Sequence, residues 1–332
     1  MEHPFAQYVQ TLGKGKRGAK DLTLQEAEQA MTMILSNQVE PVQLGAFLML
    51  MRVKEETSSE IAGFVRAARA SLTPPKNFPQ VDLDWSSYAG KRRQLPWLVL
   101  SALLLASHGT RVLMHGITGG SADRIFIPDA LHALGIEESN SLEHASSNIS
   151  SMNFAFVPLR ILSPDLDHML NLKSLLGLRS PVHTLVRMLN PISAPASIIG
   201  IFHPGYDDTH QQAAMQLGDN SLAVFKGEGG EAERNPDSPC KVKIVQAGAM
   251  SEEEWPAMFS SRHVKDADMD ISRLVKLWRG ETGDEYGTAS VLGTTAIALR
   301  ALGRAHSIAE AEAQAAQLWD TRNHKYFDRN KG

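Results

Sequence analysis

The sequence predicts an α/β protein in which a small helical N-terminal domain precedes a large α/β domain with a largely parallel central sheet flanked by helices. The first seventy residues carry helix signals throughout, and the proline-rich segment 73–79 then interrupts the pattern as the expected linker. Beyond it, short β-like runs alternate with helical stretches, which is typical of a parallel sheet. We therefore place the helical domain at residues 1–73 and the α/β domain at residues 80–332.

The helices of the N-terminal domain have recognisable starts. Thr23 and Thr57 are each followed three residues later by a glutamate, which is the pattern of a capping box. Pro41 suits the first position of a further helix. Apolar residues recur at three- and four-residue spacings, for example from Ala27 to Ile34.

In the larger domain, four apolar runs are predicted to be strands: residues 111–115, 197–202, 222–225 and 241–245. Helices are expected over residues 95–107, 164–176, 208–217, 289–302 and 308–318. A chain of 332 residues is too long for one compact core and suits this division into two domains.

Composition excludes several classes of protein. With 43% hydrophobic and 21% charged residues, the chain is neither disordered nor fibrous. Its 33 basic and 37 acidic residues give a net charge of −4, so a site for a polyanion must come from local clusters of cations. We expect a polarised surface, with the acidic stretches 252–254 and 266–270 lying away from those clusters.

The sequence also predicts a cytoplasmic protein. Cys240 is the single cysteine, which excludes an internal disulfide and suits a reducing compartment. The N-terminus lacks the pattern of a signal peptide. The most apolar stretch, Leu95–Ala106, is shorter than the roughly 20 residues needed to span a bilayer.

A first cluster of cations occupies a glycine-containing segment near the N-terminus. Residues 13–18 match the letters of a dinucleotide fingerprint, but they lack the strand that must precede it. The cluster itself consists of Lys14, Lys16, Arg17 and Lys20. A flexible cationic loop suits phosphate backbones, because neutralisation releases counterions without a fixed geometry. The alternative is a solvated basic loop.

A second cluster, Lys91, Arg92 and Arg93, stands just before the apolar helix expected from Leu95. Cations and unpaired backbone N–H groups would then converge at one helix N-terminus. Such an end attracts phosphate. We therefore expect this cluster to bind an anion.

The sequence gives little support for hydrolytic, nucleotide-binding or metal-binding sites. The chain has no nucleophile elbow, no zinc-protease motif and no Walker A sequence, and its twelve histidines show no ligand-like spacing. Glu228, Glu231 and Glu233 could hold Mg²⁺, although an exposed acidic loop is the commoner explanation. We expect no catalytic residues, no metal and no cofactor.

A series of short motifs adds a family resemblance. In chain order they are Asp21–Lys54, His115–Gly116, Gly120–Asp123, Phe154–Pro158, Leu176–Arg179, Leu189–Pro191 and His203–Pro204. In this order and spacing they resemble the anthranilate phosphoribosyltransferase and pyrimidine nucleoside phosphorylase superfamily over nearly the whole chain. The resemblance implies the fold given above, with helices around residues 164–190 completing the helical domain.

The departures from the enzymes' pattern are concentrated at the active site. The glycine-rich loop that cradles phosphoribosyl pyrophosphate in those enzymes is replaced by residues 86–93. Met114 stands in place of a phosphate-binding lysine, a serine- and lysine-containing segment is shortened to Thr118-Gly119, and the magnesium-holding Asp-Glu pair becomes Ala232-Glu233. Because this chemistry depends on positioning and electrostatics, the sequence predicts that the transferase activity is lost.

Residues 13–18 and 88–94 resemble specifically the YbiB type of this superfamily. That resemblance implies a non-catalytic protein that binds DNA or RNA, single- or double-stranded, with little sequence preference, and that forms a homodimer through the helical domain. The first cluster would line a groove with the second at its centre. Arg179 and Arg187 are further candidates, because they flank a helix that faces the inter-domain cleft in the family.

Two alternatives remain at this stage. One is a phosphoribosyl- or glycosyltransferase with a divergent active site, supported by His115–Gly116, Gly120–Asp123 and Glu233. The other is an assembly module whose helical domain recruits a partner protein. A missing glycine cradle argues against the transferase, since no other pyrophosphate site is evident in the sequence.

Overall fold

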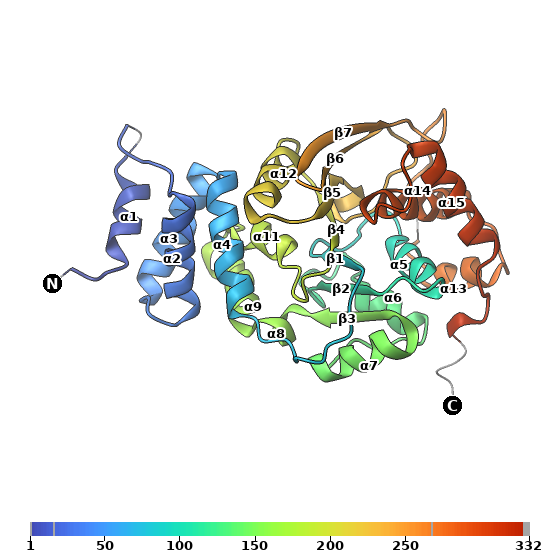
Figure 1. Ribbon diagram of the computed structural model, residues 1–332, viewed down its shortest axis with the longest axis horizontal. Helices are drawn as coiled ribbons and strands as arrows, with labels where there is room; N and C mark the ends of the chain where they lie inside the picture. Colours follow the sequence, from blue (N-terminus) through green and yellow to red (C-terminus); the bar gives the residue numbers. More distant parts are fainter. Residues whose placement is uncertain (1, 16, 267, 328–332) are drawn as a thin grey trace.

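The computed structural model describes residues 2–15, 17–266 and 268–327. Four helices form a bundle at one end of the molecule (Figure 1): α1 (Ala6–Gly13), α2 (Leu24–Leu35), α3 (Pro41–Lys54) and α4 (Ser58–Ser71). Helix α11 (Val182–Leu185), from much later in the chain, packs against α4 and against α9 (Pro164–Asn171). The bundle therefore joins the rest of the molecule through helices that are distant in sequence.

Local hydrogen bonds set the helix starts that the sequence predicts. The Thr23 and Thr57 side chains each accept from the backbone N–H three residues on, and the glutamate there accepts in return from the backbone of the threonine. Glu60, the second of these glutamates, is fully buried. It also accepts from the backbone N–H of Leu22 and from Lys54 Nζ, both at 2.8 Å.

A seven-stranded sheet forms the centre of the larger part, in the order β3-β2-β1-β4-β5-β6-β7. The parallel strands are β1 (Leu83–Ser87), β2 (Val112–Gly116), β3 (Phe154–Pro158), β4 (Ala196–Ile201) and β5 (Ser221–Lys226). An antiparallel pair, β6 (Cys240–Gln246) and β7 (Ala249–Trp255), completes the sheet. The predicted fold class is thus confirmed.

Three strands were not predicted. β1 and β3 are fully buried along their length. β3 is apolar throughout and lacks alternation, whereas β1 contains three polar residues and is not an apolar run. β7 is an edge strand, and nearly all of its residues are at least partly exposed, three glutamates among them. Its polar surface hides it from a search for apolar runs.

Helices cover both faces of the sheet (Figure 1), and each face has its own hydrophobic core. One core contains α5 (Leu98–Ser107), α6 (Ile127–Ala133), α13 (Ser272–Arg279), α14 (Glu285–Ala301) and α15 (Ile308–Asp320). The other contains the bundle, α7 (Leu142–Met152), α8 (Leu159–Leu162), α9, α11 and α12 (Tyr206–Leu217). The remaining short helices are α10 (Lys173–Leu176), η1 (Val186–Met188) and η2 (Glu228–Gly230).

The order of the strands reverses next to β1. From β1 the chain moves outward through β2 and β3, and it then returns to the other side of β1 as β4. In open α/β sheets, ligands bind outside the carboxyl ends of the strands at such a switch point. The carboxyl ends of β1, β4 and β5 are therefore the place to look for a site.

Among the described residues, no helix combines the length and the apolar character needed to cross a membrane.

Close packing of α2 on α4 depends on Gly63. A Cβ atom at this position would lie 2.3 Å from the Leu24 carbonyl oxygen and 2.7 Å from Ala27 Cβ. We expect Gly63→Ala to destabilise the fold by about 1–3 kcal/mol, because the two helices must move apart. Urea unfolding would measure this. Gly119→Ala is the control, since a Cβ there meets nothing within 4 Å; an equal effect of both changes would contradict the packing argument.

Candidate functional site

Two loops meet at the carboxyl ends of the parallel strands: the β1–α5 loop, residues 88–97, and the β5–β6 loop, residues 227–239. Glu231 of the second loop is fully buried. One carboxylate oxygen of Glu231, Oε1, accepts hydrogen bonds from the backbone N–H groups of Ala89 and Gly90, each at 2.6 Å. The loops are thus joined by an anion that the chain itself supplies.

A second buried carboxylate, that of Glu233, strengthens the junction. Its Oε1 lies 2.5 Å from Lys91 Nζ, and its Oε2 accepts at 2.8 Å from the backbone N–H of Leu98, the first residue of α5. Lys91 also donates to the Glu228 carbonyl oxygen at 3.3 Å. Burial raises the pKa of the Glu233 carboxyl, and the adjacent Lys91 ammonium opposes that shift.

These contacts correct the expectation for Lys91. The sequence placed three cations at an open helix end near Leu95, but α5 begins at Leu98 and its first N–H already binds Glu233. Lys91 is only 1% exposed, so it is not a surface contact for an external phosphate. A buried charge needs a partner, and Glu233 is the partner of Lys91.

Arg92 and Arg93, by contrast, are exposed. Arg92 Nε lies 2.8 Å from Asp123 Oδ2, and about half of each side chain remains accessible. The Arg93 guanidinium makes no ion pair among the described residues, and its carbonyl oxygen accepts from the Asp266 N–H at 3.3 Å. Of the predicted second cluster, these two residues face the solvent.

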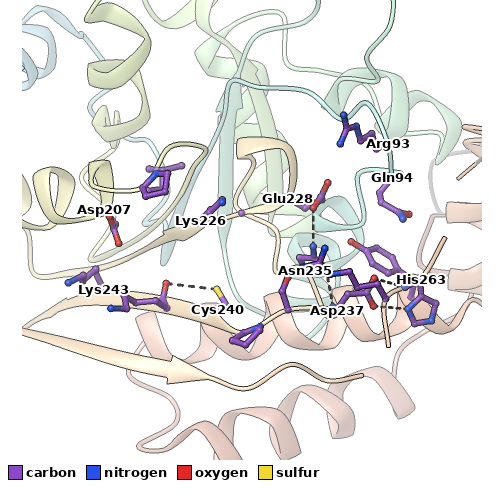
Figure 2. Close-up of a pocket in the computed structure, with 18 of the residues that line it drawn as sticks. Arg93, Gln94, Asp207, Lys226, Glu228, Asn235, Asp237, Cys240, Lys243 and His263 are labelled. Carbon is purple, nitrogen blue, oxygen red and sulfur yellow. Dashed lines mark hydrogen bonds and ion pairs between the residues drawn. The ribbon is translucent and has the colours of Figure 1, made fainter. Parts of the chain in front are cut away.

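Arg93 stands at the wall of a cavity of about 850 Å³ between the β5–β6 loop, the start of α12 and the segment after β7 (Figure 2). Four cations that line it have exposed side chains and no ion pair within the described part of the chain: Arg93, Lys226, Arg262 and Lys265. Four acids also line it: Asp207, Asp208, Glu228 and Asp237. The unpaired cations come from three separate segments.

The lysines of β6 that line the same cavity are neutralised. Lys243 Nζ lies 2.8 Å from Asp208 Oδ1 and also binds Glu252, while Lys241 Nζ lies 2.9 Å from Glu252 Oε1. The antiparallel register of β6 and β7 places Lys243 directly opposite Glu252. Acids 252–254 thus lie beside lysines that belong to neither predicted cluster, whereas Asp266 of the second acidic stretch contacts Arg93 through its backbone N–H, against the expectation for residues 266–270.

Residues 258–266 form one side of the cavity, and His263 attaches this segment to the β5–β6 loop. Its Nδ1 lies 2.7 Å from Asp237 Oδ1 (Figure 2), its backbone N–H donates to Asp237 Oδ2 at 2.9 Å, and its Nε2 lies 3.5 Å from Glu285. The hydrogen bond to Asp237 raises the pKa of His263 above its usual value. Protonation of His263 therefore strengthens its interaction with Asp237, which attaches residues 258–266 to the β5–β6 loop.

Arg187 lies inside the protein. Its Nη1 donates to the carbonyl oxygens of Gly200 at 2.8 Å and Gly230 at 3.0 Å, and burial lowers the pKa of its guanidinium. It fastens the β5–β6 loop to β4 and does not present a surface contact, which corrects its assignment as a candidate. Arg179 is exposed and lines a separate small cavity together with Arg52.

The first cluster is far from the second within one chain. Lys14, Arg17 and Lys20 are exposed on the loop between α1 and α2, and Lys16 lies outside the described residues. That loop is at the outer end of the bundle, whereas the β1–α5 loop belongs to the α/β part on the other side of α4 (Figure 1). One chain does not bring the two clusters together.

Three buried polar side chains, from β1, from the residue after it and from the carboxyl end of β2, form a chain. The Tyr88 hydroxyl oxygen is 2.7 Å from His115 Nδ1, and His115 Nε2 is 3.3 Å from Asp84 Oδ1. None of the three side chains is more than 5% exposed, and burial raises the pKa of the Tyr88 hydroxyl. His115, on which the transferase alternative depends, is closed off from solvent.

The site does not fit the magnesium ion that the enzymes of the superfamily bind. Ala232 offers a methyl group, and both oxygens of Glu233 already have partners. Glu231 binds backbone N–H groups through one oxygen. In the described part of the chain, no cluster of three or more His, Cys, Asp or Glu side chains is placed to hold a metal ion.

Sequence reasoning missed several residues of this site. Lys226, Arg262 and Lys265 stand apart from the two clusters, so charge density along the chain does not single them out. For Glu231, the sequence predicts only a metal ligand or a part of an exposed acidic loop. Its role depends on the N–H groups of residues 89 and 90, which are about 140 positions away.

Comparisons with known proteins agree with this architecture. Residues 6–72 match the helical bundle domain of a glycosyl transferase family, and residues 98–321 match the α/β domain of that family. An uncharacterized protein of Aquifex aeolicus is 29% identical over 304 residues, which are 89% of this chain and 92% of that protein. The uncharacterized protein YbiB of Escherichia coli is 25% identical over 251 residues, 74% of this chain and 78% of YbiB.

Several other relatives are anthranilate phosphoribosyltransferases, which are enzymes. Among solved structures, the anthranilate phosphoribosyltransferase of Thermus thermophilus aligns with a TM-score of 0.81 and 22% identity. The alignment covers 97% of this chain and 98% of that one. At this identity the likeness establishes the fold.

The buried pair of Lys91 and Glu233 should matter for stability. We expect Lys91→Ala to cost about 3–5 kcal/mol in the free energy of unfolding, because it leaves the Glu233 carboxylate buried without a counter-charge. Lys91→Met combined with Glu233→Gln should recover part of that loss. Urea unfolding checks both, with Arg92→Ala as the surface control. If Lys91→Ala costs no more than Arg92→Ala, Lys91 is not buried as described.

His263 predicts a pH dependence of stability. Since its pKa is raised in the folded state, its contribution is complete below the ordinary pKa of 6.5 and is lost as the pH rises through the raised value. We expect the stability advantage of the wild type over His263→Gln to be larger at pH 6 than at pH 8.5. Asp237→Asn should reduce this difference, and an advantage that is independent of pH would contradict the assignment.

Proposed function

This chain belongs to the glycosyl transferase family, and from that premise we propose that it is a non-catalytic member that binds nucleic acid with little sequence preference. The observation that carries the proposal is the closed state of the β1–α5 loop. Its N–H groups at Ala89 and Gly90 bind Glu231, and the N–H group of Leu98, at the N-terminus of α5, binds Glu233. A pyrophosphate entering here would meet two buried carboxylates in place of free donors.

The other cations near this loop, unlike the buried Lys91, are exposed to solvent. Arg92 and Arg93 project from the β1–α5 loop, and Lys226, Arg262 and Lys265 are exposed around the neighbouring cavity. Exposed, flexible cations bind phosphate backbones with strong salt dependence and without reading bases. Since acids line the cavity as well, contacts with phosphates are expected from the unpaired cations and from Arg92, about half of which stays accessible beside Asp123. Lys241 and Lys243 are neutralised by acids and are not expected to contribute.

We further propose a homodimer through the helical bundle. Val42 and Val53 of α3 are each 80% exposed, which gives the bundle an apolar surface to cover. Two-fold symmetry would supply two copies of each basic cluster. It is also the arrangement in which the loop carrying Lys14, Arg17 and Lys20 could extend a groove that begins at Arg92 and Arg93.

The test is binding of a labelled single-stranded and a labelled double-stranded oligonucleotide across a salt series, measured by fluorescence anisotropy. For Arg92→Ala/Arg93→Ala we expect weaker binding, with a slope of log K against log[salt] that is smaller by about 1.4 to 1.8, because two phosphate contacts are lost. Lys91 is left intact because its removal would disturb the fold.

Lys76→Ala/Arg111→Ala is the matched control, since it removes two exposed cations elsewhere on the surface. Its affinity and slope should equal those of the wild type. Absence of binding at low salt would refute the proposal. In that case, binding of phosphoribosyl pyrophosphate and turnover with an acceptor would test the transferase alternative, which the enzyme relatives support.

A further inference from the structure

Glu231 places its carboxylate on a pair of backbone N–H groups, a geometry that also suits an external anion. It is fully buried, and its Oε1 accepts from two successive backbone N–H groups, those of Ala89 and Gly90, at 2.6 Å. The positive φ of 67° at Gly90 gives this turn a conformation that favours glycine. Successive N–H groups that point at one atom form an anion-binding nest. Here the nest is filled from within.

Burial of the Glu231 carboxylate has a cost in free energy that its neighbours must offset. A buried carboxylate costs several kcal/mol unless hydrogen bonds and a counter-charge compensate it. Glu231 Oε2 has no hydrogen-bond partner in the described structure, so the two N–H groups at Oε1 and the nearby Arg187 supply the compensation. Charge-assisted hydrogen bonds of this kind are about twice as strong as neutral ones. The carboxylate therefore holds residues 89 and 90 firmly.

The positions of Arg92 and Arg93 depend on these hydrogen bonds to Glu231. Arg92 and Arg93 follow two and three residues after Gly90. Between them and the nest, the Lys91 N–H and C=O groups pair with Ile125 at 2.8 Å each, and its ammonium binds Glu233. With residues 89 to 91 fixed inside the protein, the next two side chains are directed outward.

We propose that Glu231 is a positioning residue for polyanion binding: its carboxylate occupies the backbone nest and thereby presents Arg92 and Arg93 to the phosphates of a nucleic acid. This inference rests on the function proposed above. The proposal predicts that removing the negative charge of Glu231 weakens the binding of a polyanion, because the cations lose their position. Simple charge repulsion predicts the opposite.

Three variants separate the two effects in the anisotropy assay. Glu231→Ala should bind the oligonucleotide about tenfold more weakly than the wild type, a loss of roughly 1.4 kcal/mol. Glu231→Gln should stay within about threefold, because its amide oxygen can accept the same two N–H groups. Asp123→Asn removes an acid that binds Arg92 and should bind as tightly as the wild type or more tightly.

Stability distinguishes positioning from a purely structural role. Both Glu231 variants lose the charge that faces Arg187, so both should melt at a lower temperature than the wild type. Only Glu231→Ala should lose affinity. If Glu231→Ala binds as tightly as the wild type, or if Glu231→Gln loses as much affinity as Glu231→Ala, the proposal is overturned.

A second measurement does not depend on nucleic acid. Glu231→Ala empties the nest, so acetate, a carboxylate of the size of the group removed, should raise its melting temperature and leave that of the wild type unchanged. Absence of this shift in Glu231→Ala would overturn the assignment of the nest. If the wild type fails to bind oligonucleotides while acetate stabilises Glu231→Ala, the proposed function is refuted and the assignment of the nest is retained.

Discussion

The capture of two backbone N–H groups by the Glu231 carboxylate is the interaction on which the rest of the site depends. It joins a loop that follows the first strand to a loop that follows the fifth. Glu233 extends the junction to Lys91 and to the start of α5. Because buried charges need partners, neither loop can move without exposing an uncompensated carboxylate or ammonium. The carboxyl end of the sheet is therefore closed by its own side chains.

This closure changes what the fold can do. At a topological switch point, the carboxyl ends of parallel strands ordinarily offer free donors to a ligand. Here the donors nearest to β1 are saturated from within, and the available charge lies farther out, on Arg92, Arg93 and the cations around the adjacent cavity. In the function proposed above, these outward cations contact several phosphates of a nucleic acid, and the backbone groups near β1 hold no phosphorylated small molecule. The family fold is compatible with both, since it fixes the strands and not the loops.

Several acids lie next to cations on this surface. The three glutamates 252–254 lie on β7 beside the lysines of β6, and Glu252 neutralises two of them. Asp123 pairs with Arg92. Around the cavity, the cations without an ion pair in the described part of the chain are Arg93, Lys226, Arg262 and Lys265, and four acids line the same cavity. Affinity for a polyanion would then come from specific residues and not from a broad positive field.

The sequence by itself determined the α/β fold with its helical N-terminal domain and the capped helices of the bundle, because these depend on short-range patterns of apolar spacing and caps. It did not reveal β7, whose polar edge position removes the apolar signal. It misplaced Lys91 and Arg187 on the surface, and it could not pair Glu231 with residues 89 and 90. Only the tertiary structure decided those points, because burial and pairing of a charge depend on groups brought together from distant parts of the chain.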